Sequence, residues 1–307
     1  MATLSENLLA LKQAKYSIKE AIEAKGKSLT GKTFAEYGAA IGSIQTGNPD
    51  LAAQLIDRTI TRITSEDFLG TVAVSKKQLA QYAFTGCKQL EYVELPNSLT
   101  HINDYAFQKC EKLTQIVIPD TLKVIADYAF KDCIKLTEVR LPVSMTFISQ
   151  GVFQNCSALI NAVLPTDLSS ISSYMFDGCT SLQSISIPNV KTLGVYTFRN
   201  CGSLTNIEFG NVLTEIGSYS FQGCNTLANV IIPNSTTKIN TAAFQNCSSL
   251  TSVELPETPP TLVNVNAFSG INSSCVFYCK SAESLAAYQG ASNWSSLSNT
   301  YTFTVKE

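Results

Sequence analysis

Residues 90–110 read LEYVELPNSLTHINDYAFQKC, and residues 113–133 read LTQIVIPDTLKVIADYAFKDC. The two stretches share their aliphatic, proline, Ala-Phe and cysteine positions. The same cysteine recurs every 23 residues, except once after 22, at Cys87, Cys110, Cys133, Cys156, Cys179, Cys201, Cys224 and Cys247. A period in this range predicts a solenoid, in which each unit buries its apolar edge against its neighbours.

Each repeat contains two kinds of hydrophobic spacing. Val93 and Leu95 alternate with polar residues, which predicts a short strand with one buried face. Ala83 and Cys87 lie at positions i and i+4, which predicts the inward stripe of a helical or 3₁₀ turn. A proline follows most strands and ends each of them at the same corner. We therefore predict a right-handed superhelix with one parallel β-sheet and short helical or 3₁₀ turns.

The pattern Leu-x-x-Ile-x-Ile-Pro, followed by Ala-Phe-x-x-Cys, resembles the BspA-like leucine-rich repeats of bacteria over about residues 79–268. The resemblance implies a leucine-rich repeat solenoid with parallel strands. It also implies a binding role, because members of that family are mostly secreted or surface proteins that bind other molecules. We assign residues 79–270 to the leucine-rich repeats.

Residues 1–46 follow a different pattern, which predicts a helical N-terminal module. One heptad-spaced stripe consists of Leu4, Leu8, Leu11, Ile18 and Ile22. A capping-box signature at Thr33 and Glu36 begins a second predicted helix. We expect an α-helical hairpin that shields the first coil or oligomerises through residues 1–45. This segment resembles short N-terminal modules on tail-associated proteins of gut phages and prophages.

The ends of a solenoid need caps, because its terminal coils would otherwise expose apolar faces. Residues 47–78 are predicted to hold a linker and an N-terminal cap coil. In that coil Ile63 precedes Phe68 by five residues, the same spacing that each repeat has between an aliphatic residue and its phenylalanine.

Residues 271–307 are predicted to form the C-terminal cap. This segment resembles the closing segment common in the family. Its pattern predicts a strand at 275–280, a helix at 281–289 and a last strand at 301–305. We interpret Trp294 as a plug on the last coil.

The composition excludes several classes of function. Charged residues make up 15% of the chain, against a typical ~25%. A net charge of -2 provides no basic field, so we expect no nucleic-acid partner. The chain has no run of about 18 apolar residues, so no membrane span is expected. The charged start, residues 1–26, does not resemble a signal peptide.

The cysteine file admits three interpretations: disulfides between neighbouring coils, an array of metal sites, or buried free thiols. Parallel side chains on identical rungs do not favour the disulfide dihedral. A metal site needs ligands from several directions. We favour buried free thiols and expect no metal or cofactor. Cys275 and Cys279 are spaced like a ligand pair, but they would lie roughly 13 Å apart on an extended strand, so we also interpret them as structural.

The sequence gives little support to an enzyme. Acid–base chemistry at a histidine would depend entirely on His101, which we expect to be an exposed or half-buried turn residue. Glu94, Glu208 and Glu254 share a strand position but lie on non-adjacent coils, too far apart for a pair of catalytic carboxylates. No nucleophile elbow or phosphate-binding loop appears.

The best candidates for binding are the residues that should point outward from the predicted strands, because they vary while the core positions stay constant. The predicted partner-binding residues are Tyr92, Glu94, Gln115, Val117, Glu138, Arg140, Asn161, Val163, Asn206 and Glu208. Plain solvated sheet would show the same variation. A tyrosine recurs two residues before most of the phenylalanines, from Tyr82 to Tyr219. We expect these rings to pack along the turn edge, while a role in stacking on sugars or proteins stays open.

We therefore predict a non-enzymatic binding or adhesion module that presents a repeat-sheet surface to a protein or glycan partner. The alternative is a structural or receptor-binding component of a phage or prophage tail. The corresponding locations are the cell surface or extracellular space, or a virion.

Overall fold

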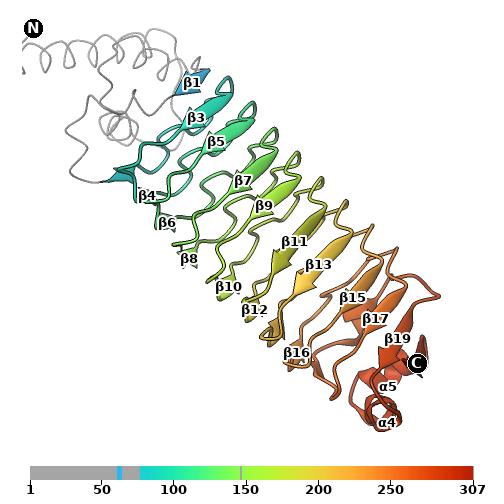
Figure 1. The fold of residues 1–307 in the computed structure, drawn as a ribbon. Helices are drawn as coiled ribbons and strands as arrows, with labels where there is room; N and C mark the ends of the chain where they lie inside the picture. Colours follow the sequence, from blue (N-terminus) through green and yellow to red (C-terminus); the bar gives the residue numbers. More distant parts are fainter. Residues whose placement is uncertain (1–60, 64–76, 146, 307) are drawn as a thin grey trace, which may run out of the picture. The chain divides into compact units, whose positions relative to one another are not determined.

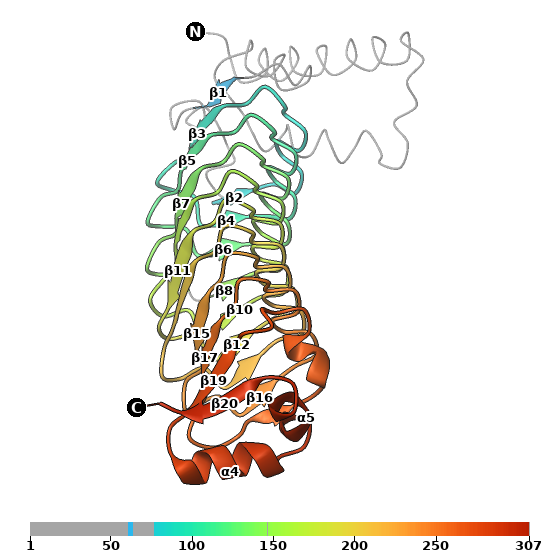
Figure 2. The same cartoon turned by 90° about the vertical axis from the view of Figure 1, so that its right-hand side faces the viewer.

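The computed structural model describes residues 61–63, 77–145 and 147–306. These residues form a solenoid of stacked coils, in which two ladders of parallel strands run side by side along the stack (Figures 1 and 2). The predicted leucine-rich repeat solenoid is confirmed. The predictions for residues 1–46, and those for most of residues 47–78, lie outside the described residues.

The first ladder, here called the long-strand ladder, contains most of the strands of three or four residues. Its backbone register is regular: Tyr92 lies opposite Gln115, and Glu138 lies opposite Asn161. Its strands are β1 (Arg62–Ile63), β3 (Tyr92–Glu94), β5 (Gln115–Val117), β7 (Glu138–Arg140), β9 (Asn161–Val163), β11 (Ser184–Ile187), β13 (Asn206–Phe209), β15 (Asn229–Ile231), β17 (Ser252–Glu254), β19 (Val276–Cys279) and β20 (Thr302–Val305).

The second ladder, here called the short-strand ladder, consists of two-residue strands. The first residue of each strand faces outward and the second is buried. Its strands are β2 (Gln78–Leu79), β4 (His101–Ile102), β6 (Val124–Ile125), β8 (Phe147–Ile148), β10 (Ser170–Ile171), β12 (Thr192–Leu193), β14 (Glu215–Ile216), β16 (Lys238–Ile239) and β18 (Thr261–Leu262). We expected one parallel sheet from the sequence, whereas the structure has this second ladder as well.

The turns are of 3₁₀ type, as predicted, but most do not extend into helices. Backbone N–H groups of Cys87 and Leu90 donate to the carbonyl oxygens three residues earlier. In most coils the residue two before the phenylalanine has a positive φ, as at Tyr105 (57°), and this interrupts a regular helix. The last coil has Asn266 there without a positive φ, and a 3₁₀ helix, η3 (Val265–Phe268), forms.

Phenylalanine and cysteine build the centre of the core. The phenylalanine rings from Phe84 to Phe268 stack coil upon coil, with neighbouring centroids 5.0–5.8 Å apart. Each cysteine thiol from Cys110 to Cys247 donates to the carbonyl oxygen of the phenylalanine in the preceding coil, at 3.1–3.2 Å. All ten cysteines are buried and free, which agrees with the favoured interpretation of the file.

Hydroxyl side chains add hydrogen bonds between the coils at their edges. Thr100 Oγ1 donates to the carbonyl oxygen of Lys77, and Thr114 Oγ1 donates to that of Glu91, each at 3.0 Å and 23 residues away. Thr214 repeats this bond to Lys191 at 3.0 Å. The same carbonyl oxygens accept the backbone N–H groups of these threonines, so each hydroxyl adds a second bond between neighbouring coils.

The C-terminal cap closes the last coil much as the sequence predicts. Helix α4 (Ala282–Gly290) begins at an N-cap serine, and strands β19 and β20 pair in parallel. Trp294, in the additional helix α5 (Trp294–Ser298), is fully buried. Its Nε1 donates to the carbonyl oxygen of Pro260 at 2.8 Å, and its ring packs against Phe268 and Tyr288. The predicted tryptophan plug is therefore confirmed.

The interpretation of Ile63 is wrong. We expected it to be equivalent to Leu79, five residues before a phenylalanine. It instead pairs with Val93 in the long-strand ladder, as Arg62 does with Tyr92. The strand pairing, and not the spacing from Phe68, therefore shows which repeat position Ile63 occupies.

Candidate functional site

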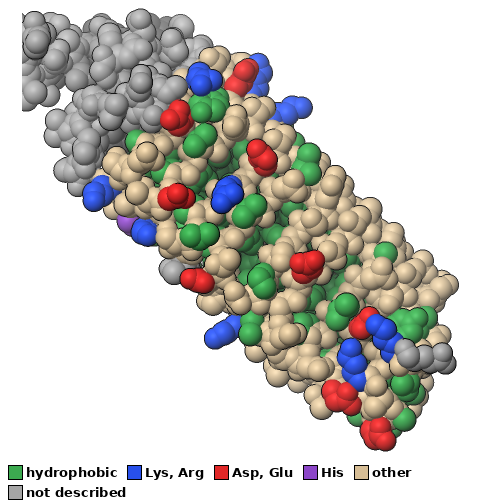
Figure 3. Space-filling view, viewed as in Figure 1, with side chains coloured by type: hydrophobic (Ala, Val, Ile, Leu, Met, Phe, Trp, Pro, Cys, Tyr) green, Lys and Arg blue, Asp and Glu red, His purple; other side chains and the backbone are tan. Residues whose placement is uncertain are grey.

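The predicted partner-binding residues lie on the outer face of the long-strand ladder, and most of them are exposed. Tyr92 and Glu94 are half-buried. The exposed members are Gln115, Val117, Glu138, Arg140, Asn161, Val163, Asn206 and Glu208. Figure 3 shows this face: uncharged polar and hydrophobic atoms cover most of it, and charged side chains are few and scattered.

The structure brings only part of this set together. Val117, Arg140 and Val163 occupy the same position on β5, β7 and β9, and Arg140 pairs directly with Val163. Asn206 and Glu208 lie on β13, beyond β11, and pair with the small residues Ser184 and Ser186. The predicted residues therefore do not form one continuous site.

A hollow of about 540 Å³ opens between β5 and β7 beside this group. Val117 and Arg140 line it, together with Val143, which is 65% exposed at the corner after β7. Val163 is 53% exposed next to Arg140. We call Val117, Arg140, Val143 and Val163 the Arg140 patch. Val143 is not among the predicted residues, because the corner residue after each proline gives no periodic signal.

Tyr92 is engaged at the N-terminal end of the ladder. The Arg62 guanidinium lies over its ring, 4.0 Å from the centroid. The ring is thus half-covered by a neighbouring strand. Tyr92 is therefore a weaker candidate for partner contact than the exposed residues of the Arg140 patch.

The tyrosine row packs along the turn edge, as favoured from the sequence. Tyr82, Tyr105 and Tyr128 stack at 5.1–5.4 Å, and Tyr196 stacks between its two tyrosine neighbours at 4.9–5.1 Å. The row is interrupted at Gly151, where a Cβ atom would lie 2.2 Å from the Tyr128 ring. The ring of Tyr128 therefore fills the space that a tyrosine at that position would need.

An ion pair between the buried Asp177 carboxylate and the partly exposed Arg199 reinforces this edge. Arg199 donates to both carboxylate oxygens of Asp177, at 2.8 and 2.7 Å, and its guanidinium lies 4.3 Å from the Tyr196 ring centroid. Gln154 Nε2 also donates to Asp177, at 2.8 Å. The Asp177 carboxylate raises the pKa of Arg199. All partners lie within the turn edge, so the pair is structural.

The residues considered for chemistry are scattered or engaged. His101 is half-buried in β4, a strand instead of the expected turn, and its Nδ1 lies 2.8 Å from Thr100 Oγ1. Glu254 pairs with Lys280 and Lys306 beside the cap. In the part of the chain that the structure describes, no three His, Cys, Asp or Glu residues gather as potential metal ligands. None of the helices described there has the length and apolar content needed to cross a membrane.

Burial makes the thiols inert as nucleophiles. It raises the pKa of Cys247 and of Cys275 to about 12. The pKa values of Cys201 and Cys224 are also well above that of a free thiol, first because of burial and then because of the neighbouring sulfurs. Since the thiolate is the reactive form, this file has a packing role.

Comparison with known proteins identifies the repeat. Residues 77–201 and 170–293 match the BspA type leucine-rich repeat region. The chain belongs to the BspA-type leucine-rich repeat family. The match covers more than half of the chain, and it includes strands β2 to β19 and the turn edge. This family is a repeat scaffold, and the matches include no catalytic family.

Solved structures of leucine-rich repeat proteins are similar to this BspA-type chain. One from Bacteroides ovatus is 28% identical, with a TM-score of 0.63, over 73% of this chain and 56% of the other. One from Eubacterium ventriosum is 25% identical, with a TM-score of 0.50, over 57% of this chain and 47% of the other. One from T. pallidum is 37% identical, with a TM-score of 0.46, over 49% of this chain and 71% of the other. The chain thus spans about half the length of the first two structures.

Comparison with functionally curated proteins gives no significant match. The resemblance of residues 1–46 to tail-associated phage modules is not supported by the matches, which concern the repeats.

Proposed function

We propose that the chain is a non-enzymatic binding module and that the Arg140 patch is the centre of its contact with a partner. The observation that carries the proposal is the exposure of several valines around one arginine on a rigid sheet. Val117 is 40% exposed, and Val143 and Val163 are more exposed still. Apolar side chains at these positions add nothing to the core, which is complete beneath them.

The chemistry of the patch favours a protein partner over a glycan. Valine side chains have no polar atoms to bond the hydroxyl groups of a sugar. The hollow is lined by Asp120 and Ser144 as well as by the valines. A guanidinium flanked by valines can bind a carboxylate in two-point fashion while the valines pack against apolar side chains. Arginine is also enriched among the residues that dominate the energy of protein interfaces.

The neighbouring outward residues supply a polar rim. Gln115, Glu138 and Asn161 lie in the adjacent outward file of β5, β7 and β9. A polar rim around a small apolar centre is the usual arrangement of a protein interface. The partner would thus contact three adjacent coils, those of β5, β7 and β9.

The test compares two matched sets of variants. The partner is first identified on a panel of purified extracellular proteins and on a glycan array, and its dissociation constant is then measured by biolayer interferometry. Arg140→Ala with Val163→Ala should weaken binding at least tenfold. The control set, Ile134→Ala with Lys135→Ala, removes the same kinds of group from an exposed part of the same coil and should change it by less than twofold.

Thermal unfolding of both variants should match that of the wild type, because all four substitutions are at exposed positions. Equal affinities for the wild type and the Arg140 variant would refute the assignment of the patch. A glycan partner whose binding is lost in the Arg140 variant would refute the preference for a protein at this patch.

A further inference from the structure

Phe147 is the one phenylalanine of the described residues that stands mainly in water. It is 55% exposed on β8, whereas the phenylalanines of the core file are fully buried. The same outward position of the short-strand ladder holds Val124 on one side and Ser170 on the other. The core does not need an aromatic ring here, because the buried residue of this strand is Ile148.

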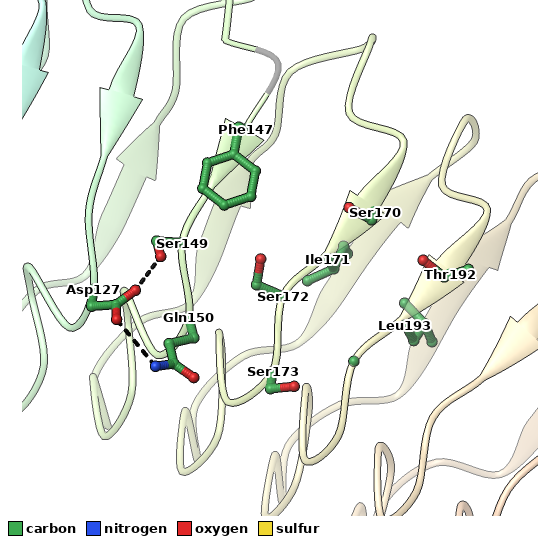
Figure 4. A pocket seen from close by; sticks show the side chains of 11 residues that line it. Asp127, Phe147, Ser149, Gln150, Ser170, Ile171, Ser172, Ser173, Thr192 and Leu193 are labelled. Atoms are coloured by element: carbon green, nitrogen blue, oxygen red, sulfur yellow. Dashed lines mark hydrogen bonds between the residues drawn. The ribbon is translucent and has the colours of Figure 1, made fainter.

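A hollow of about 490 Å³ opens beside this ring, over the next two coils (Figure 4). It exists because the residues on those coils are small. Besides Phe147, the side chains around it include Ser149, Ser170, Ser172, Ser173 and Thr192. The hollow is shallow and largely open to solvent, so it could contact only one side of a small ligand.

The backbone beneath the hollow departs from the ladder pattern. The Ile125 and Ile171 carbonyl oxygens accept backbone N–H groups of the following coil, at 3.0 and 2.8 Å. The Ile148 carbonyl oxygen instead accepts the hydroxyl of Ser172, at 2.6 Å. Farther along, Gly194 packs so closely that a Cβ atom would lie 2.5 Å from the Ser173 nitrogen. The floor is thus held by contacts between coils.

The polar groups around the ring are fixed in place. The Asp127 carboxylate accepts hydrogen bonds from the Ser149 hydroxyl and from Gln150 Nε2, the latter at 3.1 Å (Figure 4). Hydroxyls that donate within the protein, such as those of Ser149 and Ser172, still have lone pairs to accept a bond from a ligand. The lining residues include this one carboxylate and no cation, so the hollow disfavours anions.

We propose that the hollow beside Phe147 is a subsite for a neutral pyranose sugar. A pyranose has a face of C–H groups that can lie on an aromatic ring and a rim of hydroxyls that can bond serines and a carboxylate. The hollow offers these two surfaces together: Phe147 on one side, and Asp127 with Ser149 and Ser172 on the other. A single sugar ring in so open a site would bind with a dissociation constant on the order of 1 mM.

This subsite is separate from the Arg140 patch, which lies on the other ladder. The repeat pattern does not indicate this subsite, because a single exposed ring occurs in only one coil. The two ladders would therefore bind two different kinds of ligand.

The test uses the full chain and three probes: methyl β-glucoside, methyl β-galactoside and N-acetylglucosamine. Saturation-transfer NMR should give a saturable signal for at least one of them, strongest at the C–H protons of one ring face. Phe147→Ala should reduce that signal at least fivefold, while Phe147→Tyr should retain it. Cyclohexanol is the apolar control probe and should give no saturable signal.

A matched control tests for general effects of exposed apolar residues. Ile231 is 59% exposed on the long-strand ladder, and Ile231→Ala should leave the sugar signal unchanged. The Arg140→Ala variant should also leave it unchanged, so the two proposals can fail independently. The absence of a signal for all three sugars at 20 mM, an unchanged signal in Phe147→Ala, or an equal signal for cyclohexanol would overturn the proposal.

Discussion

The buried thiols predict that the solenoid loses stability steeply at alkaline pH. Burial raises the pKa of eight thiols: those of Cys110, Cys156, Cys179, Cys201, Cys224, Cys247, Cys275 and Cys279. In the unfolded chain a thiol ionises near pH 9. In the folded chain Cys247 ionises only at about 12. Their contribution to stability is therefore complete below pH 9 and is lost as the pH rises towards 12.

The size of the effect follows from the proton linkage. We consider a thiol that stays protonated in the folded chain and ionises near pH 9 in the unfolded chain. Such a thiol lowers the free energy of unfolding by about 1 kcal/mol between pH 9 and pH 10. Above pH 10 the cost approaches about 1.4 kcal/mol per pH unit. The six of these thiols that belong to the repeat file remove about 6 kcal/mol between pH 9 and pH 10, which is comparable with the whole stability of a typical domain. We expect the free energy of unfolding to fall sharply between pH 9 and pH 10.5.

Urea unfolding followed by circular dichroism from pH 7 to pH 10.5, in the presence of a phosphine reductant, measures this fall. Cys201→Ala should destabilise the protein by about 1–2 kcal/mol at pH 7, because buried volume and a hydrogen bond to the Phe176 carbonyl are lost. Its free energy of unfolding should fall less steeply with pH than that of the wild type, because one ionising thiol is missing. The two values should therefore become equal near pH 10.

Ile216→Val is the matched control, because it also trims a fully buried side chain but removes no titrating group. Its curve should run parallel to that of the wild type at every pH. Ellman's reagent should label none of the ten cysteines before unfolding. A flat wild-type curve up to pH 10, or a Cys201→Ala curve parallel to the wild type, would refute the neutral, buried state of the thiols.

Three further pairs of variants test the turn edge and a corner, each by urea unfolding. Gly210→Ala should lower the free energy of unfolding by more than about 2 kcal/mol, because a Cβ atom would lie 1.5 Å from the Pro188 carbonyl oxygen. Gly202→Ala should change it by less than about 0.5 kcal/mol, because no atom lies within 4 Å of a Cβ atom there. Arg199→Met should cost about 3 kcal/mol because it leaves a buried carboxylate unpaired, and adding Asp177→Leu should recover much of the loss. Tyr196→Ala should cost about 2 kcal/mol through lost stacking, while Tyr196→Phe should stay within about 0.5 kcal/mol; equal costs for the paired variants would contradict these assignments.

The sequence predicted the coils and their interior well because burial follows spacing directly. A cysteine or phenylalanine that recurs at one phase must meet its own copies, and the structure places them in continuous files. The outward positions of the long strands followed from the same alternation. Residue spacing therefore determines which side chains face the core and which face the solvent.

The short-strand ladder was missed because its strands are too short to alternate. Each contains one outward and one buried residue, as at His101 and Ile102, so the sequence shows only an aliphatic residue that recurs once in every coil. The hollow beside Phe147 was missed for a related reason. It depends on the sizes of side chains on successive coils, such as Ser149, Ser172 and Thr192, and no single repeat contains that information.

Departures from the repeat are of two kinds, which differ in whether a neighbouring side chain compensates for the change. At Gly151 the Tyr128 ring fills the vacated space, and at Asp177 the Arg199 guanidinium neutralises the buried carboxylate. Both departures are balanced by a neighbour within the fold. The ring of Phe147 and the valines around Arg140 have no such internal compensation, because they expose apolar surface that the core does not need. The two proposed sites are departures of the second kind, so we expect substitutions at Phe147 and at Arg140 to alter binding and to leave unfolding unchanged.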